Sequence, residues 1–256
     1  MSDFADRIRA QEKLVGYWVT LDVPPATERI ARLGYDYVVL DGQHGLIGYQ
    51  GLLNGLLAID AGASIGERTT VGLVRVEAND PTPIGRALDA GAVGVIVPLV
   101  DSADDVVRAV QAAKYPPVGG RSFGPMRASL RIGPVPADAN AATVVLAMIE
   151  TPLGLMHVEE ICATPGLDGV YVGPSDLGLA LGARFPGDPE IDGQFEVALE
   201  LIARTAAEAG IAAGIHTFDG DSAKRRLSQG YSFATVASDL SHLEAIAAAH
   251  LDTARS

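Results

Sequence analysis

The sequence predicts a single (β/α)8 barrel, an α/β fold in which eight parallel strands alternate with helices. A first observation is a repeated pattern: a glycine, a short run rich in Val, Ile or Leu, and then polar residues, as in LGYDYVVLD from residue 33 and AGAVGVIVPLV from residue 90. A second is that helical patterns separate these runs. Short apolar runs alternating with helices are typical of buried parallel strands, and eight such units predict a closed barrel.

The elements follow one another in strict order. Glycines that end helices precede several apolar runs, and acidic residues with Ser102 begin a helix with apolar positions at helical spacing. We expect strands at roughly 14–20, 36–41, 70–76, 93–98, 143–149, 168–172, 210–215 and 231–236. We expect helices at about 25–33, 48–62, 81–90, 102–113, 152–163, 174–182 with 190–209, 219–229 and 239–250.

The alternative to a barrel is a doubly wound open sheet. No G-x-G-x-x-G motif follows the first predicted strand, which disfavours that alternative. No Gly/Ser or Pro linker divides the chain, so residues 1–256 are expected to form one domain. The one long irregular stretch is 114–142, with Arg121, Arg127 and Arg131; loops of that length in compact domains are usually functional.

Composition excludes several classes of partner. The formal charge is −13, without a basic stripe, so nucleic acid and anionic membranes are not expected to bind. No run of 18 apolar residues predicts a membrane span, and the N-terminal segment has no apolar core typical of a secretory signal. The single cysteine, Cys162, falls in an apolar helical pattern and cannot form an intramolecular disulfide. A cytoplasmic location is therefore expected.

Polar residues at the carboxyl ends of the predicted strands are the candidate site, because barrels carry their chemistry there. Glu150 ends the fifth apolar run and Asp176 follows the sixth. Neighbouring strand ends lie about 5–10 Å apart, so both carboxylates can reach one ion, and oxygen ligands suit Mg²⁺ or Mn²⁺. The alternative is that both are ordinary acids at helix starts, which the helix dipole favours.

Arg75 ends the third strand, and Asp41 ends the second with His44 three residues later. An arginine there must face an anion or water, so Arg75 either holds a carboxylate or enolate oxygen or forms a rim ion pair. A carboxylate that orients an imidazole makes a plausible general base, although a histidine after a strand is often structural.

Three further strand ends carry weaker signals. In GPSDLG, Pro174 suits a first helical position, so the amides of Ser175 and Asp176 could hold a carboxylate or form an ordinary helix cap. Trp18, the only tryptophan, either walls a small pocket or packs in the core. His216 lacks a nearby acidic residue in sequence and is interpreted as structural.

Several stretches together resemble the HpcH/HpaI aldolase family of metal-dependent class II pyruvate aldolases. They are DGQHGLIGY, VRVEANDPTPIGRALDAGAVGVIVPLVDSADDVVRAVQAAKYPPVGGRSFGP, AMIET and GLDGVYVGPSDLGLALG, and they span roughly residues 14 to 240. The resemblance implies a (β/α)8 barrel whose last helix is often exchanged with a neighbouring subunit, in trimers or hexamers. It also implies reversible cleavage of a 4-hydroxy-2-oxo acid to pyruvate, or hydroxypyruvate, and an aldehyde through a metal-bound enolate.

The resemblance also implies a role for each matching residue. Glu150 and Asp176 would bind Mg²⁺ or Mn²⁺, with Co²⁺ as a further candidate, and Arg75 would contact the keto oxygen. His44 would transfer protons beside Asp41. Trp18, Gly173 and the amides of Ser175 and Asp176 would bind the substrate, completing the set implied by the family motif.

Two positions depart from the family pattern. Met148 stands where many relatives carry Gln, which puts a polar contact at that position in doubt. Gln43 stands where some relatives carry Glu, which puts a negative charge at that position in doubt. Two other functions stay open: a carbon–carbon lyase acting on a CoA thioester, as in citrate-lyase-like barrels, and a non-catalytic barrel that binds a keto acid. Basic residues lining a CoA channel would favour the first, and degenerate metal and proton-transfer residues the second.

Overall fold

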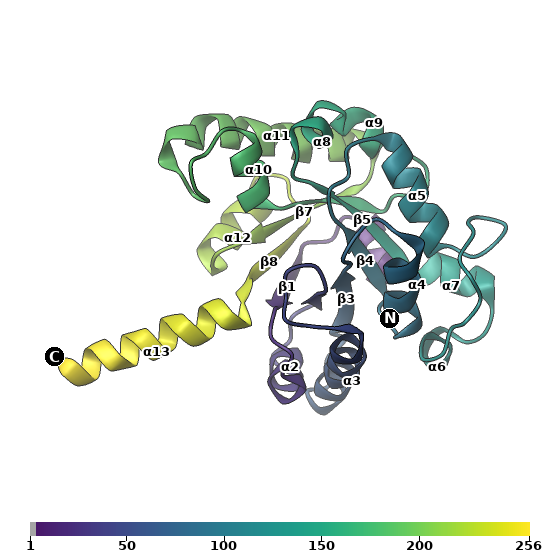
Figure 1. Cartoon of the computed structure of the whole chain (residues 1–256), viewed down its shortest axis with the longest axis horizontal. Helices are drawn as coiled ribbons and strands as arrows, with labels where there is room; N and C mark the ends of the chain where they lie inside the picture. The colour runs from purple at the N-terminus through teal and green to yellow at the C-terminus, as the bar shows by residue number, and fades with distance from the viewer. Residues whose placement is uncertain (1–3) are drawn as a thin grey trace.

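The computed structural model describes residues 4–256 and confirms the predicted barrel (Figure 1). Eight strands pair in chain order and in parallel, and β8 closes on β1. The strands are β1 (Leu14–Val19), β2 (Tyr37–Asp41), β3 (Val71–Arg75), β4 (Gly94–Val97), β5 (Val144–Ile149), β6 (Gly169–Val172), β7 (Ala212–Thr217) and β8 (Phe233–Ser238). The last two begin two residues later than expected.

Helices cover the outside of the barrel. They are α1 (Phe4–Arg9), α2 (Pro24–Ala31), α3 (Tyr49–Ile65), α4 (Pro81–Asp89), α5 (Ala103–Ala113), α6 (Ala128–Ile132), α7 (Pro136–Ala142), α8 (Pro152–Met156), α9 (Val158–Cys162), α10 (Pro174–Ala180), η1 (Pro189–Ile191), α11 (Asp192–Ala209), α12 (Gly220–Ser228) and α13 (Asp239–Arg255). None of them, within the part of the chain described, has the length and apolarity needed to cross a membrane.

Alternating side chains along each strand build two cores. On β2, Val38 and Leu40 pack outward against the helices, whereas Tyr37 and Val39 belong to the smaller core inside the barrel. The interior holds large rings because a neighbouring strand offers a glycine. A Cβ at Gly16 would lie 2.1 Å from the Tyr37 ring, so a larger residue there would displace that ring. The filled interior supports the carboxyl ends of the strands from below.

The segment 114–142 differs from its sequence expectation. It contains α6 and α7, and its arginines form ion pairs within the chain: Arg121 with Asp89, and Arg127 and Arg131 both with Asp60. Asp89 ends α4 just before β4, and Lys114 donates to the carbonyl of Thr143 just before β5. The segment therefore lies at the amino-terminal end of the barrel, away from the carboxyl ends of the strands.

The final helix stands apart from the barrel. Figure 1 shows α13 projecting from the end of β8 into open space. No residue of α13 is buried, and its exposed apolar side chains are Leu240, Leu243, Ile246 and Leu251. The remainder of the described chain, by contrast, packs on the barrel.

Candidate active site

A pocket of about 180 Å³ opens at the carboxyl ends of the strands. It is called the mouth pocket below. Its walls are Trp18, His44, Arg75, Met148, Tyr171, Gly173, Pro174, Ser175, Asp176 and His216. Six of these are residues predicted from the sequence, and the two other predicted residues, Asp41 and Glu150, lie directly behind the wall. The barrel thus brings together side chains from strands that are far apart in the chain.

Arg75 lines the mouth pocket, and Asp41 holds it from behind the wall. They are register partners on β3 and β2, and the guanidinium donates from Nε to Oδ1 at 2.9 Å and from Nη2 to Oδ2 at 2.6 Å. Burial alone would raise the pKa of Asp41, but the hydrogen bonds and charge of Arg75 lower the pKa below its ordinary value. Asp41 is therefore a fixed anion that holds a cation at the barrel mouth.

Asp41 has a different relation to His44 from the one expected. Its Oδ1 accepts the backbone N–H groups of Gln43 at 3.0 Å and His44 at 3.2 Å, which closes the turn after β2. No hydrogen bond joins the carboxylate to the imidazole within residues 4–256. Direct orientation of the imidazole by Asp41 is thus wrong; Asp41 shapes the loop that carries His44, whose exposed side chain lines the pocket.

Trp18 acts both as pocket wall and as core. Its indole Nε1 donates to Asp41 Oδ2 at 3.2 Å, and the Arg75 guanidinium carbon lies 5.0 Å from the centre of its ring. The Trp18 ring also stacks on Tyr171, with ring centroids 5.9 Å apart. These contacts combine cation–π and stacking interactions, so the ring holds the arginine in one orientation.

Glu150 is a buried carboxylate with one unsatisfied oxygen. Oε1 accepts the N–H of Leu99 at 2.8 Å, whereas Oε2 is buried and has no donor in the described part of the chain. Leu99 presents that N–H with a φ of +54°, a left-handed conformation that costs free energy in a non-glycine residue. Burial raises the pKa of Glu150 above its usual range, and the charge of Asp176 raises it further.

Glycine is required beside this carboxylate. A Cβ at Gly173 would lie 2.4 Å from Glu150 Oε2 and 2.9 Å from Met148 Cε. Asp176 follows in the first turn of α10, where its side chain is exposed and lines the mouth pocket. Gly173 therefore leaves room for Glu150 Oε2 on the side of the pocket that also holds Asp176.

The two carboxylates fit a hard divalent cation. An anionic oxygen that is buried without a donor is costly unless a cation satisfies it, and a second carboxylate raises that cost. No group of three or more His, Cys, Asp or Glu side chains that could hold a metal occurs within the described chain. A cation here would therefore complete its coordination with water and substrate oxygens, as Mg²⁺ commonly does.

His216 is a pocket residue that sequence reasoning interpreted as structural. Its ring meets Trp18 edge-on, with centroids 5.3 Å apart, and its Nδ1 is buried with no hydrogen-bond partner among residues 4–256. Burial and the positive charge of Arg75 lower the pKa of His216 to about 4, so the imidazole is neutral at pH 7. The position of His216 near the end of β7 was the sequence signal for a place in the site. The signal was given little weight because no acidic residue lies next to His216 in the sequence.

The two positions that depart from the family pattern have different surroundings. Met148 is buried on β5 and lines the mouth pocket next to Gly173. The wall of the pocket is therefore apolar at this position. Gln43 lies in the turn after β2, and its Oε1 is buried without a hydrogen-bond partner among residues 4–256. Because the amide is neutral, the Gln43 side chain adds no charge to the pocket.

Two known proteins are similar in sequence to this chain over most of its length. The chain is 39% identical over 231 residues to the hydroxypyruvate/pyruvate aldolase of Rhizorhabdus wittichii, covering 90% of this chain and 89% of that protein. It is 34% identical over 241 residues to the 5-keto-4-deoxy-D-glucarate aldolase of Salmonella paratyphi C, covering 93% and 90%.

A solved structure gives the same result for the fold. A HpcH/HpaI aldolase/citrate lyase family protein from Burkholderia cenocepacia superposes with a TM-score of 0.88 at 30% identity, covering 98% of each chain. Residues 14–245 also match the sequence model described as HpcH/HpaI aldolase/citrate lyase. The resemblance noted from the motifs is confirmed, and this chain belongs to the HpcH/HpaI aldolase/citrate lyase family.

Proposed function

We propose that the chain is a divalent-metal-dependent aldolase that reversibly cleaves a 4-hydroxy-2-oxo acid to pyruvate, or hydroxypyruvate, and an aldehyde. One observation carries the proposal: the fixed cation Arg75 and the carboxylates Glu150 and Asp176 meet around a single pocket of about 180 Å³. A small 2-oxo acid matches that volume and that pattern of charge. The names of the two aldolase relatives support carbon–carbon lyase activity.

Glu150 and Asp176 are the proposed metal ligands. The orphaned Oε2 of Glu150 and the exposed carboxylate of Asp176 provide two anionic oxygens, which favour Mg²⁺ or Mn²⁺, with Co²⁺ as a further candidate. When bound, such an ion supplies Lewis-acid polarisation of the 2-oxo group. The amides of Ser175 and Asp176, with Gly173 before them, are proposed to hold the substrate carboxylate.

Arg75 stabilises the oxygen that becomes negative. Its Nε and Nη2 are occupied by Asp41, while Nη1 has no hydrogen-bond partner among residues 4–256. That nitrogen is free to donate to the substrate's 2-oxo oxygen as charge develops. Because Asp41 and Trp18 already fix the guanidinium, little reorganisation accompanies the reaction.

His44 moves the proton. In cleavage, a base takes the proton of the C4 hydroxyl, the C3–C4 bond breaks, and its electron pair forms the enolate; C3 then gains a proton to give pyruvate. The imidazole of His44 is exposed in the pocket wall and can act directly or through a water molecule. Trp18 is proposed to wall the pyruvate side.

The barrel is proposed to be one domain that works as a homo-oligomer, a trimer or hexamer. The projecting helix α13 exposes Leu240, Leu243, Ile246 and Leu251 to solvent in the single chain. An apolar helix surface of this kind favours burial against a second copy, as in an exchanged C-terminal helix. Sedimentation of the full chain, compared with a chain that ends at Ser238, measures this part of the proposal.

Exchange of the pyruvate methyl protons with deuterium tests the chemistry. The protein is treated with EDTA, and exchange is followed by NMR with and without Mg²⁺ or Mn²⁺, first with pyruvate and then with hydroxypyruvate. Metal-dependent exchange is expected, because the enolate forms without any aldehyde. No exchange with either acid and any of the metals would contradict the proposal and favour a thioester lyase or a non-catalytic barrel.

A further inference from the structure

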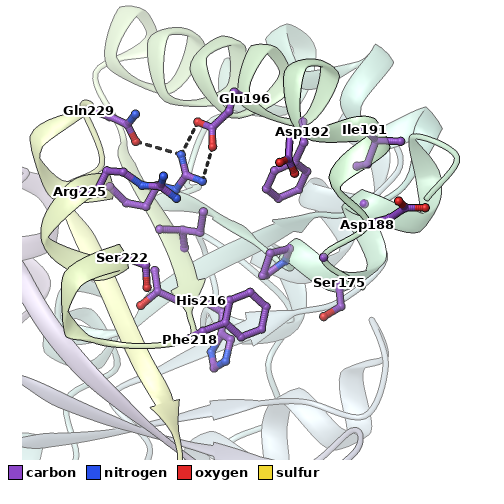
Figure 2. Close-up of a pocket in the computed structure, with 17 residues that line it drawn as sticks. Ser175, Asp188, Ile191, Asp192, Glu196, His216, Phe218, Ser222, Arg225 and Gln229 are labelled. Carbon is purple, nitrogen blue, oxygen red and sulfur yellow. Dashed lines mark hydrogen bonds and ion pairs between the residues drawn. The ribbon is translucent and has the colours of Figure 1, made fainter. Parts of the chain in front are cut away.

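A second, larger cavity adjoins the mouth pocket. This side cavity has a volume of about 590 Å³ and is formed by α10, η1 and α11 on one side and by β7 and α12 on the other (Figure 2). Pro174, Ser175 and His216 line both the mouth pocket and the side cavity. Because these three residues line both, the two compartments lie side by side.

The side cavity offers an apolar surface. Ile191, Phe195, Ile215 and Phe218 line it, and the Phe218 ring is 66% exposed. Figure 2 shows Phe218 and His216 at one end, with Glu196 and Gln229 at the other. An exposed aromatic ring in a concave wall is typical of a site that binds an apolar group.

The charges of the side cavity are compensated by the protein itself. Arg226 donates to both oxygens of Glu196, at 2.5 and 2.7 Å, and to Gln229 Oε1 at 2.9 Å. Asp188 accepts two hydrogen bonds from the Arg184 side chain, at 2.8 and 3.0 Å. A ligand anion would therefore have to compete with an existing partner for Arg226.

Two lining side chains remain outside these pairs. Asp192 and Arg225 are exposed, carry opposite charges and have no ion-pair partner in the part of the chain described. Because these two charges are opposite in sign, they add no net charge to the side cavity, which therefore does not favour an anionic ligand over a neutral one.

His216 stands at the junction of the two compartments. Its ring is neutral at pH 7 because burial and Arg75 lower its pKa to about 4. A neutral imidazole donates one hydrogen bond and accepts one, and Nδ1 has no partner in the described residues. Such a group suits an uncharged oxygen, for example that of an aldehyde, better than a carboxylate.

We propose that the side cavity is the acceptor compartment of the same active site and takes aldehydes whose body is bulky, uncharged and largely apolar. This inference rests on the proposed aldolase function and adds the class of acceptor. Pyruvate C3 loses a proton to the base and forms the enolate; C3 then bonds to the aldehyde carbon at the junction as the C=O π bond opens. The aldehyde oxygen takes up a proton from the protonated base, and the body of the aldehyde lies against Phe195 and Phe218. The side cavity, at about 590 Å³, has more room for a bulky acceptor than the mouth pocket, at about 180 Å³.

Three aldehydes test the preference of the wild-type enzyme for its acceptor. Benzaldehyde is bulky and neutral, 4-carboxybenzaldehyde has a similar ring with a negative charge, and glycolaldehyde is small. We expect kcat/KM for addition of pyruvate to be highest with benzaldehyde, by about tenfold over each of the other two. Equal or better use of 4-carboxybenzaldehyde or glycolaldehyde overturns the inference.

A filling substitution tests the location. A Cβ at Gly178 has only Ala183 and Ile191 within 4 Å, both at 3.9 Å, so Gly178→Leu places a side chain in the side cavity without a close contact at Cβ. We expect this change to lower kcat/KM for benzaldehyde about tenfold relative to glycolaldehyde. Gly193→Leu, on the exposed surface of α11 and outside the lining, is the matched control. An unchanged ratio in Gly178→Leu overturns the location.

A charge substitution gives an independent result that does not depend on packing. Phe218→Lys adds a cation at an exposed position of the cavity wall, and Phe185→Lys adds the same charge at an exposed ring outside the lining. Only Phe218→Lys is expected to shift the preference toward 4-carboxybenzaldehyde, by about tenfold. The same shift in both variants, or in neither, overturns the inference.

The aldolase proposal and this inference fail in different ways. Exchange of the pyruvate methyl protons requires the mouth pocket and no aldehyde. Wild-type protein without exchange contradicts the aldolase proposal itself. Wild-type protein that exchanges protons yet ignores benzaldehyde contradicts the acceptor compartment alone.

Discussion

Asp41 and Arg75 lie opposite each other on neighbouring parallel strands and form a buried ion pair through two hydrogen bonds. Burying both groups at the mouth of a barrel costs free energy, which their attraction offsets only with good geometry. The pair occupies Nε and Nη2 of Arg75, and Nη1 has no hydrogen-bond partner within residues 4–256. The proposed chemistry depends on this relationship, and several measurements address it and its surroundings.

Removing the anion of this pair should destabilise the protein strongly. Asp41→Ala leaves Arg75 buried without its partner, and we expect the free energy of unfolding to fall by about 3–5 kcal/mol. Urea denaturation measures the change. Glu12→Ala, which removes an exposed ion pair with Arg7 at 2.9 Å, is the control and should cost about 0–1 kcal/mol. Similar losses in the two variants would show that the Asp41 pair is not stabilising.

Glu150 should oppose stability in the metal-free protein. The pKa of Glu150 is higher in the folded protein than in the unfolded chain. The protonated side chain therefore stabilises the fold below the ordinary carboxyl pKa, and this stabilisation is lost as pH rises through the raised pKa. Glu150→Gln removes the charge. We therefore expect the EDTA-treated variant to have a higher Tm at pH 7 than the wild type.

Metal addition should reverse that order. Mn²⁺ is expected to raise the Tm of the wild type and not that of Glu150→Gln, because a ligand that binds only the folded state stabilises it. Glu159→Gln, an exposed carboxylate on α9, should behave as the wild type. A Glu150→Gln variant that is stabilised by Mn²⁺ as much as the wild type would exclude Glu150 as a ligand.

Loss of the His44 imidazole should separate proton transfer from metal binding. We expect His44→Ala to slow exchange of the pyruvate methyl protons by about 10²–10⁴-fold, the range for removal of a general base. Metal affinity, measured by calorimetry with Mn²⁺, should be unchanged because His44 is not a proposed ligand. Exchange at the wild-type rate would rule out the role of His44 in proton transfer.

The space beside Glu150 should tolerate no side chain. Gly173→Ala places a Cβ 2.4 Å from Glu150 Oε2, so the carboxylate must move. We expect metal affinity to fall by about 10–100-fold, as when the support of a metal ligand is disturbed. Gly193→Ala, where a Cβ meets nothing within 4 Å, should leave that affinity unchanged. Equal affinity in the two alanine variants would place the metal away from Glu150.

His216 should make folding stability depend on pH. Its pKa in the fold is about 4, below the ordinary 6.5, so the unfolded chain binds more protons between these values. The stability contributed by neutral His216 is present above pH 6.5 and is lost as pH falls toward 4. His216→Gln, compared with wild type by urea denaturation at pH 7 and pH 4.5, should lose less stability on acidification. Equal losses would show that His216 titrates normally.

Local pattern was sufficient for much of the architecture. Apolar runs, glycines and helical spacing predicted eight strands and their order, because these signals report burial and period along the chain. They also located Glu150 and Asp176 at strand ends; in the barrel Asp176 lines the mouth pocket, and Glu150 lies behind the wall next to Gly173. The split of the expected helix 152–163 at His157 was not predicted, because it depends on a bond from His157 Nδ1 to the distant carbonyl of Asp101.

The amino-acid sequence by itself determined the barrel, the family and the residue types at the strand ends. Only the tertiary structure decided that Asp41 pairs with Arg75 and not with the His44 imidazole, because strand register joins residues 34 positions apart. It also placed His216 beside Trp18 and the segment 114–142 at the amino-terminal end of the barrel. Periodicity specifies which face of a strand is buried, whereas the partner of a side chain depends on how distant strands meet.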